Sequence, residues 1–86
     1  MVYIRRIPLR ENYREQFRIL GLRIAYYRKL RGLTQEQMAE AIGRSLSFVS
    51  QIEANNAKEV KGISLETLFK ISSVLEVPVS KLFDTD

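Results

Sequence analysis

The side chains best suited to specific chemistry in this sequence are hydroxyls and amides. Ser47, Ser50 and Gln51 lie within one short segment, and Gln35 precedes them. A hydroxyl donates and accepts hydrogen bonds, and an amide presents a donor beside an acceptor, a pair that matches one edge of an adenine base. The chemistry expected of this set is therefore recognition through hydrogen bonds.

Catalytic and metal chemistry have little support in the sequence. The chain contains no His and no Cys, which excludes a histidine general base, a thiol nucleophile and the usual zinc ligands. Glu36 and Glu40 lie four residues apart, but no second ligand pair accompanies them, and a solvated helix face is the simpler interpretation. No glycine-rich phosphate loop occurs. We therefore expect neither an enzyme nor a bound cofactor or metal.

Length and composition predict one small domain. The chain has 86 residues, of which 45% are hydrophobic, enough for one core and too few for two. Its apolar runs fall far short of the roughly 20 residues that span a bilayer, and the N-terminus lacks the apolar region of a signal peptide. These features favour a cytoplasmic protein that contacts no membrane.

A short helix is expected over residues 34–42. Met38, Ala39 and Ile42 are spaced three and four apart, so they share one face, and that face must be buried. Gly43 follows the last apolar residue, at a place where a chain leaving a helix often adopts a positive φ. The sequence therefore predicts a sharp turn directly after this helix.

A second short helix is expected over residues 46–54, with Ser45 or Ser47 as its N-cap. Val49 and Ile52 point inward from it, whereas the hydroxyl and amide side chains point outward. Two short helices that cross at a tight turn are chiefly used to place the second helix in the major groove of DNA.

Three further helices complete an all-α domain that spans residues 12–86. Asn12 is expected to cap the first of them, with Glu15 reaching back as in a capping box, and Ser64 is expected to cap the next. The expected ranges are 12–30, 64–75 and 79–83.

Residues 1–11 are expected to form an extended basic arm, since Pro8 forbids a helix through it. Two interpretations remain open. In the first, the arm wraps a DNA duplex and Arg5 and Arg6 neutralise phosphates; in the second, it is a flexible or partner-binding tail.

Because none of these helices is long enough to be stable alone in water, their apolar faces must form one shared core. The expected core residues are Leu20, Ile24, Tyr27, Leu33, Met38, Ala39, Ile42, Val49, Ile52, Leu65, Leu68, Phe69, Leu75 and Leu82.

Several short motifs carry a resemblance to a known family. They are RKLRG from Arg28, LTQEQMA from Leu33, Gly43, QIE from Gln51 and SLETLFKI from Ser64. Together they make Gly32 to Leu82 resemble the lambda-repressor-like helix-turn-helix family, also called the xenobiotic-response-element type. The resemblance implies a compact five-helix DNA-binding domain whose third helix enters the major groove.

The resemblance also implies roles for individual residues. Base edges are expected to be contacted by Ser47, Ser50 and Gln51, with Leu46 as a further candidate. Phosphates are contacted by Gln35, Arg44, Asn55, Asn56, Lys58 and Lys61, with Arg5 and Arg6 of the arm as further candidates. Arg28 and Glu53 form a structural ion pair between the first and third helices.

Two residues depart from the family pattern. Leu46 stands where family members often carry a polar residue that makes the first base contact. Arg44 stands where they often carry a buried aliphatic residue. Either Leu46 contacts a thymine methyl and Arg44 a phosphate, or Leu46 folds back into the core space that Arg44 leaves. Phe48 faces outward in the expected register, and either contacts a groove edge or packs against the following loop.

The charge distribution leaves two functions open. Residues 1–31 carry nine Lys or Arg against two Glu, whereas residues 32–86 carry five Lys or Arg against eight acids. The predicted function is sequence-specific binding of double-stranded DNA by a small transcriptional regulator, a repressor acting as a homodimer. The acidic balance of the second region keeps one alternative, a protein-binding module of the same fold, of antitoxin or coactivator type.

Overall fold

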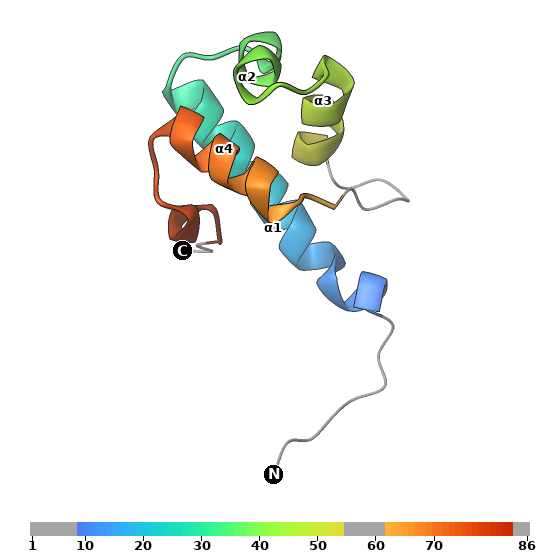
Figure 1. The fold of residues 1–86 in the computed structure, drawn as a ribbon. Helices are drawn as coiled ribbons and strands as arrows, with labels where there is room; N and C mark the ends of the chain where they lie inside the picture. Colours follow the sequence, from blue (N-terminus) through green and yellow to red (C-terminus); the bar gives the residue numbers. More distant parts are fainter. Residues whose placement is uncertain (1–8, 55–61, 84–86) are drawn as a thin grey trace.

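A computed structural model describes residues 9–54 and 62–83, and these form helices only (Figure 1). The elements are α1 (Leu9–Leu30), α2 (Gln35–Ile42), α3 (Leu46–Ala54), α4 (Leu65–Leu75) and a short 3-10 helix, η1 (Val79–Phe83). The fold is therefore the expected all-α domain, with four α-helices and a final 3-10 turn. The ends predicted for the last four elements agree with the structure to within one residue.

The start of α1 differs from the prediction. The helix begins at Leu9 and runs through Asn12, so the prediction that Asn12 caps it is wrong, and the helix starts three residues before the expected boundary. Pro8 immediately precedes the helix in the sequence, and a proline is well tolerated at a helix start, where its missing N–H would have no partner in any case. Residues 1–8, including Arg5 and Arg6, lie outside the described residues.

Local sequence explains both ends of α2 and the start of α3. The Thr34 hydroxyl accepts a hydrogen bond from the Gln37 backbone N–H at 3.0 Å, and the Gln37 side chain accepts one from the Thr34 N–H at 2.9 Å, which makes a capping box. Gly43 ends α2 with φ of 72°, as expected. Ser45 caps α3, since its hydroxyl accepts from the Phe48 N–H at 3.1 Å.

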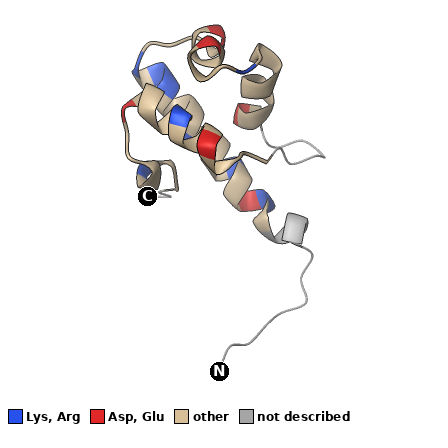
Figure 2. Cartoon of the chain, in the orientation of Figure 1, with Lys and Arg blue, Asp and Glu red and all other residues tan. Residues whose placement is uncertain are grey.

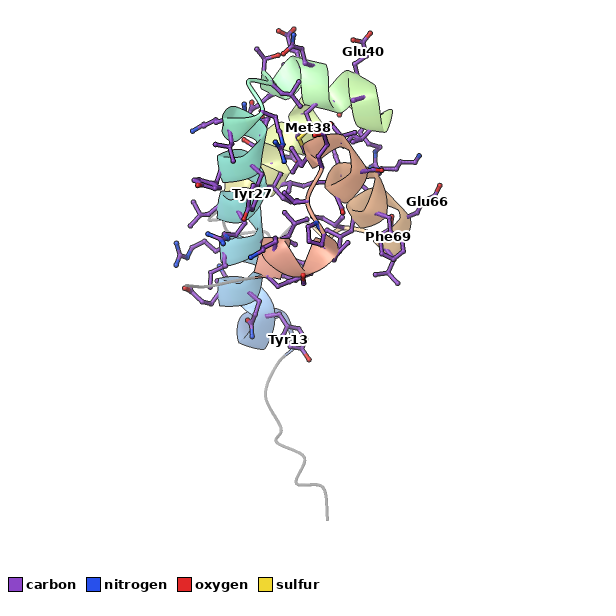
Figure 3. All side chains as sticks on the ribbon, turned by 90° about the vertical axis from the view of Figure 1, so that its left-hand side faces the viewer. Tyr13, Tyr27, Met38, Glu40, Glu66 and Phe69 are labelled. Carbon is purple, nitrogen blue, oxygen red and sulfur yellow. The ribbon has the colours of Figure 1, made fainter. Side chains whose placement is uncertain are left out.

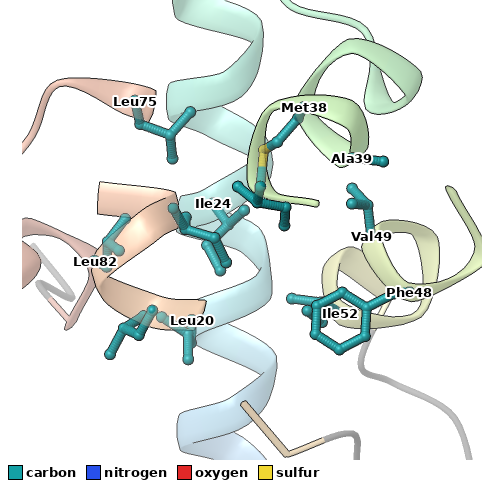
Figure 4. Close-up of a cluster of buried hydrophobic side chains, with 12 residues drawn as sticks. Leu20, Ile24, Met38, Ala39, Phe48, Val49, Ile52, Leu75 and Leu82 are labelled. Atoms are coloured by element: carbon teal, nitrogen blue, oxygen red, sulfur yellow. The ribbon is translucent and has the colours of Figure 1, made fainter. Parts of the chain in front are cut away.

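The helices pack around one cluster of buried side chains (Figure 4). α1 contacts α3, α4 and η1, and α2 contacts both α3 and α4. Met38 lies in the interior between these elements (Figure 3). The buried hydrophobic residues are Leu20, Ile24, Met38, Ala39, Ile42, Phe48, Val49, Ile52, Leu68, Ile71, Leu75 and Leu82.

The predicted core was wrong on one face of α4. Leu65 is 69% exposed and Phe69 is 57% exposed, and Phe69 points away from the molecule in Figure 3, whereas Ile71 is fully buried. This helix carries apolar residues on more than one face, so helical spacing alone does not identify the inner one. Tyr27 and Leu33 are partly buried and pack against the cluster.

Two contacts fix the position of α1. At Gly21, a Cβ atom would overlap the carbonyl oxygen of Ile52 and lie 3.2 Å from that of Glu53, so α1 approaches the end of α3 as closely as glycine allows. Arg31, the residue directly after α1, donates from Nε to the carbonyl oxygen of Leu75 at 2.7 Å and thereby caps α4. In the described part of the chain, no helix combines the length and apolar character needed to cross a membrane.

Candidate nucleic-acid interface

A buried ion pair joins α1 to the end of α3. Arg28 Nε donates to one carboxylate oxygen of Glu53 at 2.6 Å, and a terminal guanidinium nitrogen donates to the other at 2.9 Å. A third nitrogen of Arg28 donates to the Leu33 carbonyl oxygen at 2.7 Å. Arg28 is only 7% exposed. The two-point geometry fixes the direction of α3 relative to α1, because a planar guanidinium and a carboxylate pair in one orientation.

Gln35 connects α2 to the same arrangement. Its side-chain Nε2 donates to Glu53 at 2.9 Å, and its Oε1 accepts a hydrogen bond from the Ser50 hydroxyl, also at 2.9 Å. The first residue of α2 thus contacts α3 at two positions one turn apart. Three helices are held by one continuous set of hydrogen bonds, which leaves α3 little freedom to rotate.

The outer face of α3 carries three of the four predicted base-reading residues. Leu46 is 44% exposed, and Ser47 and Gln51 are exposed as well. Gln51 Nε2 approaches the Ser47 hydroxyl oxygen at 3.4 Å, a long contact that leaves both groups accessible to a ligand. Ser50 is half-buried because of its bond to Gln35.

Phe48 does not face outward, and this corrects the expected register. It is 7% exposed and belongs to the core cluster. The Arg44 guanidinium lies over its ring, with Cζ 3.7 Å from the ring centroid, and also donates to the Thr67 hydroxyl at 3.4 Å. Phe48 is therefore the core residue at this end of α3, and the exposed Leu46 does not fold back into the core. Helical spacing carried a usable signal, because Phe48 precedes Ile52 by four residues and the two therefore share a face.

Charge is sparse on this part of the molecule. Glu53 is the one charged residue of α3, and most of the helix is tan in Figure 2. Arg44 is exposed immediately before α3. The described residues contain no group of three His, Cys, Asp or Glu side chains that could hold a metal ion. The predicted phosphate contacts Asn55, Asn56, Lys58 and Lys61 lie outside the described residues.

Known proteins share this sequence pattern. A model of the Helix-turn-helix family matches residues 24–82. The chain is 38% identical over 66 residues to the HTH-type transcriptional regulator SinR of Bacillus subtilis, an alignment that covers 77% of this chain and 57% of SinR. It is 50% identical over 38 residues to YazB, an uncharacterized HTH-type transcriptional regulator of the same species, covering 44% of this chain and 55% of YazB. The chain thus spans less than two thirds of the length of these relatives.

Solved structures share the fold. The restriction-modification controller protein C.AhdI from Aeromonas hydrophila superposes with a TM-score of 0.71 at 26% identity, covering 80% of this chain and 98% of that one. SinR solved in complex with DNA superposes with a TM-score of 0.66 at 38% identity, covering 76% and 98%. The relatives are transcriptional regulators rather than enzymes. On the family match and the arrangement of α2 and α3 together, this chain belongs to the lambda-repressor-like helix-turn-helix family, and within it resembles SinR.

Proposed function

We propose that this chain binds double-stranded DNA sequence-specifically, with α3 in the major groove, and acts as a transcriptional repressor. The observation that carries the proposal is the contrast between the two faces of α3. Its inner face is fixed by Ile52 in the core and by Glu53 in the ion pair, while its outer face presents uncharged polar groups. SinR, 38% identical, has been solved in complex with DNA.

The hydrogen bonds of Ser50 and Gln51 define what each can read. Ser50 uses its hydroxyl hydrogen on Gln35, so toward a base it acts as an acceptor, which suits the amino group of adenine or cytosine. Gln51 retains a donor and an acceptor and suits adenine. Leu46 is exposed beside them and offers an apolar surface to a thymine methyl.

Phosphate contacts are proposed at both flanks of α3. Gln35 donates one amide hydrogen to Glu53, and its second amide hydrogen is available for a phosphate oxygen, close to the N–H groups that begin α2. Arg44 is an exposed residue before α3 and supplies positive charge there, while its guanidinium lies against Phe48 and Thr67. Asn55, Asn56, Lys58, Lys61, Arg5 and Arg6 remain proposed contacts on sequence grounds.

The experiment that tests sequence-specific binding is selection of bound duplexes from a random pool, followed by affinity measurements with variants. Gln51→Ala and Leu46→Ala should each relax preference at one base pair, by about 1–3 kcal/mol of discrimination for Gln51. Leu65→Ala is the matched control, because Leu65 is an exposed residue on α4. Equal effects of the control, or no enriched motif even at low salt, would contradict the proposal.

Repression is tested separately by placing the selected site over a promoter that drives a reporter. Co-expression of the chain should lower reporter output, and Gln51→Ala should restore it. Because one module contacts only a few base pairs, the selected sites are expected as inverted half-sites about one helical turn apart. Higher reporter output in the presence of the chain would indicate activation instead.

The contribution of the N-terminal arm is tested by deleting residues 1–8, which precede α1. If Arg5 and Arg6 contact phosphates, the slope of log affinity against log salt should flatten by about 0.9 for each lost contact. An unchanged slope would exclude the arm as a phosphate clamp.

A protein-binding module is the second candidate function. The acidic balance of residues 32–86 and the single charge on α3 favour it, and a relative 38% identical, covering 77% of this chain and 61% of that one, is solved as a SinR–SinI complex. An empty DNA selection would leave this candidate as the better one.

A further inference from the structure

The two serines of α3 use their hydroxyl hydrogens differently. The Ser50 hydroxyl donates to Gln35 Oε1 at 2.9 Å. The Ser47 oxygen instead receives a long contact from Gln51 Nε2 at 3.4 Å, which does not use the Ser47 hydrogen. A hydroxyl has a single hydrogen beside its acceptor lone pairs. Ser50 therefore has only lone pairs left for a ligand, whereas Ser47 can still donate as well as accept.

The direction of the Ser50 hydrogen bond is set by residues that lie behind it. Gln35 Nε2 donates to Glu53 at 2.9 Å, and the same carboxylate accepts hydrogen bonds from Arg28 through both of its oxygens. An ionised carboxylate can only accept, so the Gln35 amide must turn its nitrogen toward Glu53 and its oxygen toward Ser50. An amide oxygen has no hydrogen to give. Ser50 must therefore be the donor in this bond.

We propose that Gln35 is a positioning residue that determines which bases Ser50 accepts. The inference rests on the proposed entry of α3 into the major groove and deepens it. Because Gln35 holds Ser50 as an acceptor, Ser50 should select a base that offers an exocyclic amino group, which is adenine or cytosine. Guanine and thymine present oxygen acceptors in that groove, and these would set lone pairs against lone pairs.

The arrangement resists reversal because it is anchored in the protein interior. We call the set of linked hydrogen bonds the relay; its members are Arg28, Glu53, Gln35 and Ser50. The side chains of Arg28 and Glu53 are buried, and Gln35 and Ser50 are half-buried. A reversed Gln35 amide would set its oxygen against the Glu53 carboxylate and lose the hydrogen bond that it now donates. An acceptor facing an acceptor away from water is costly, so the amide should keep one orientation.

A phosphate contact by Gln35 would leave a different signature. Phosphates carry no sequence information directly, so loss of such a contact should lower the affinity for all duplexes in the same proportion. Loss of the relay should instead change the ratio between bases at one base pair. The two roles of Gln35 can therefore be separated with one set of variants.

Selection of bound duplexes from a random pool tests the relay. Ser50→Ala first identifies the base pair that Ser50 contacts, because its preference should disappear. Gln35→Met, which is similar in length and cannot hold the hydroxyl, should then lower the preference for an amino-bearing base at that pair by about two- to tenfold. The pair identified by Ser47→Ala is the matched control, and Gln35→Met should not alter it. Circular dichroism melts establish that each variant is folded.

Two further variants test whether Gln35 acts through Ser50. In a Ser50→Ala chain, adding Gln35→Met should leave the remaining base ratios unchanged, because the hydroxyl that Gln35 orients is gone. Gln35→Lys offers donors only, so it should release the Ser50 hydrogen and move the preference toward guanine or thymine. An amino-base preference that persists in both single Gln35 variants would overturn the inference while leaving sequence-specific binding in place. A native chain that selects no motif would contradict the proposed function instead.

NMR of the free chain tests the relay without DNA. The side-chain amide protons of Gln35 should give nuclear Overhauser effects to the side chain of Glu53 and not to the Hβ protons of Ser50. The same pattern should persist in Ser50→Ala, because Glu53 still holds the amide nitrogen. Strong effects between the Gln35 amide protons and the Ser50 Hβ protons would show the amide turned the other way, and would overturn the inference whatever the DNA selection gives.

Discussion

Two arginine–glutamate pairs begin on α1, and they serve different purposes. Arg28 reaches across to Glu53 of α3, and the side chains are 9% and 6% exposed. Arg18 binds Glu15 three residues earlier on the same helix, and those side chains are 44% and 64% exposed. The first pair fixes one helix against another in a water-poor junction, whereas the second lies in solvent and contributes little to folding. The two pairs have the same chemistry but different roles. A pair stabilises the fold when it is buried and when it joins two different helices.

The largest effect is expected when one half of the buried pair is removed. Glu53→Gln leaves the Arg28 guanidinium buried without a counter-charge, and we expect a loss of about 3–5 kcal/mol of unfolding free energy, measured by urea denaturation. Adding Arg28→Met should recover part of this loss, because the unpaired charge is then gone. If the Glu53→Gln variant were as stable as the native chain, the buried pair would contribute as little to folding as the exposed one.

The apolar part of the same junction is tested by Ile52→Ala. Ile52 is 1% exposed, so truncation should create a cavity and lower the unfolding free energy by about 2–5 kcal/mol. Leu68→Ala, on α4, should fall in the same range, since Leu68 is 6% exposed. Melting temperatures that do not change would show that the packing assignment is wrong.

Gly21→Ala tests how closely α1 and α3 approach each other. In an isolated helix this substitution would be stabilising by about 1 kcal/mol. Here the new Cβ would overlap the backbone oxygen of Ile52, and backbone cannot rotate away, so we expect destabilisation of about 1–3 kcal/mol. The sign of the change decides the matter: a more stable variant would mean that the helices can separate without cost.

The smallest effect is expected at the exposed pair. The hydrogen bond from Arg18 holds the pKa of the Glu15 carboxyl below its ordinary value. Because the folded pKa is lowered, any stabilisation is present above the ordinary pKa and is lost as pH falls through the folded pKa. Arg18→Gln should raise the pKa of Glu15 toward its ordinary value in an NMR titration, while the thermal midpoint at neutral pH stays unchanged. A clear drop in that midpoint would erase the contrast with Arg28.

The sequence predicted the helix-turn-helix segment well because its signals are local. Gly43 and Ser45 each act on their own helix end, and the inward positions of Val49 and Ile52 follow from helical spacing. The resemblance to a family then pointed to Arg28, Glu53 and Gln35, which the structure brings together.

The failures occurred where the outcome depends on neighbouring elements. α4 offers more than one apolar face, and only packing against α1 and α2 decides that Ile71 is inside and Phe69 outside. Phe48 lies in the core with the Arg44 guanidinium over its ring, a contact with a residue outside α3 that the sequence pattern did not predict. Gly21 lies within a helix, which is an unfavourable place for glycine and a usable sign of close packing, but the helix that approaches it could not be named from sequence.

The hydrogen bond from Arg31 to the end of α4 has a consequence for cooperativity. It joins residues 44 positions apart in the chain, while Arg28, one turn earlier, joins α1 to α3. Opening of α3 or of α4 must therefore disturb the same segment, the C-terminal end of α1 and the residue that follows it. We expect amide hydrogens in α3 and α4 to exchange with solvent at similar rates under native conditions, as one unfolding unit rather than as separate segments.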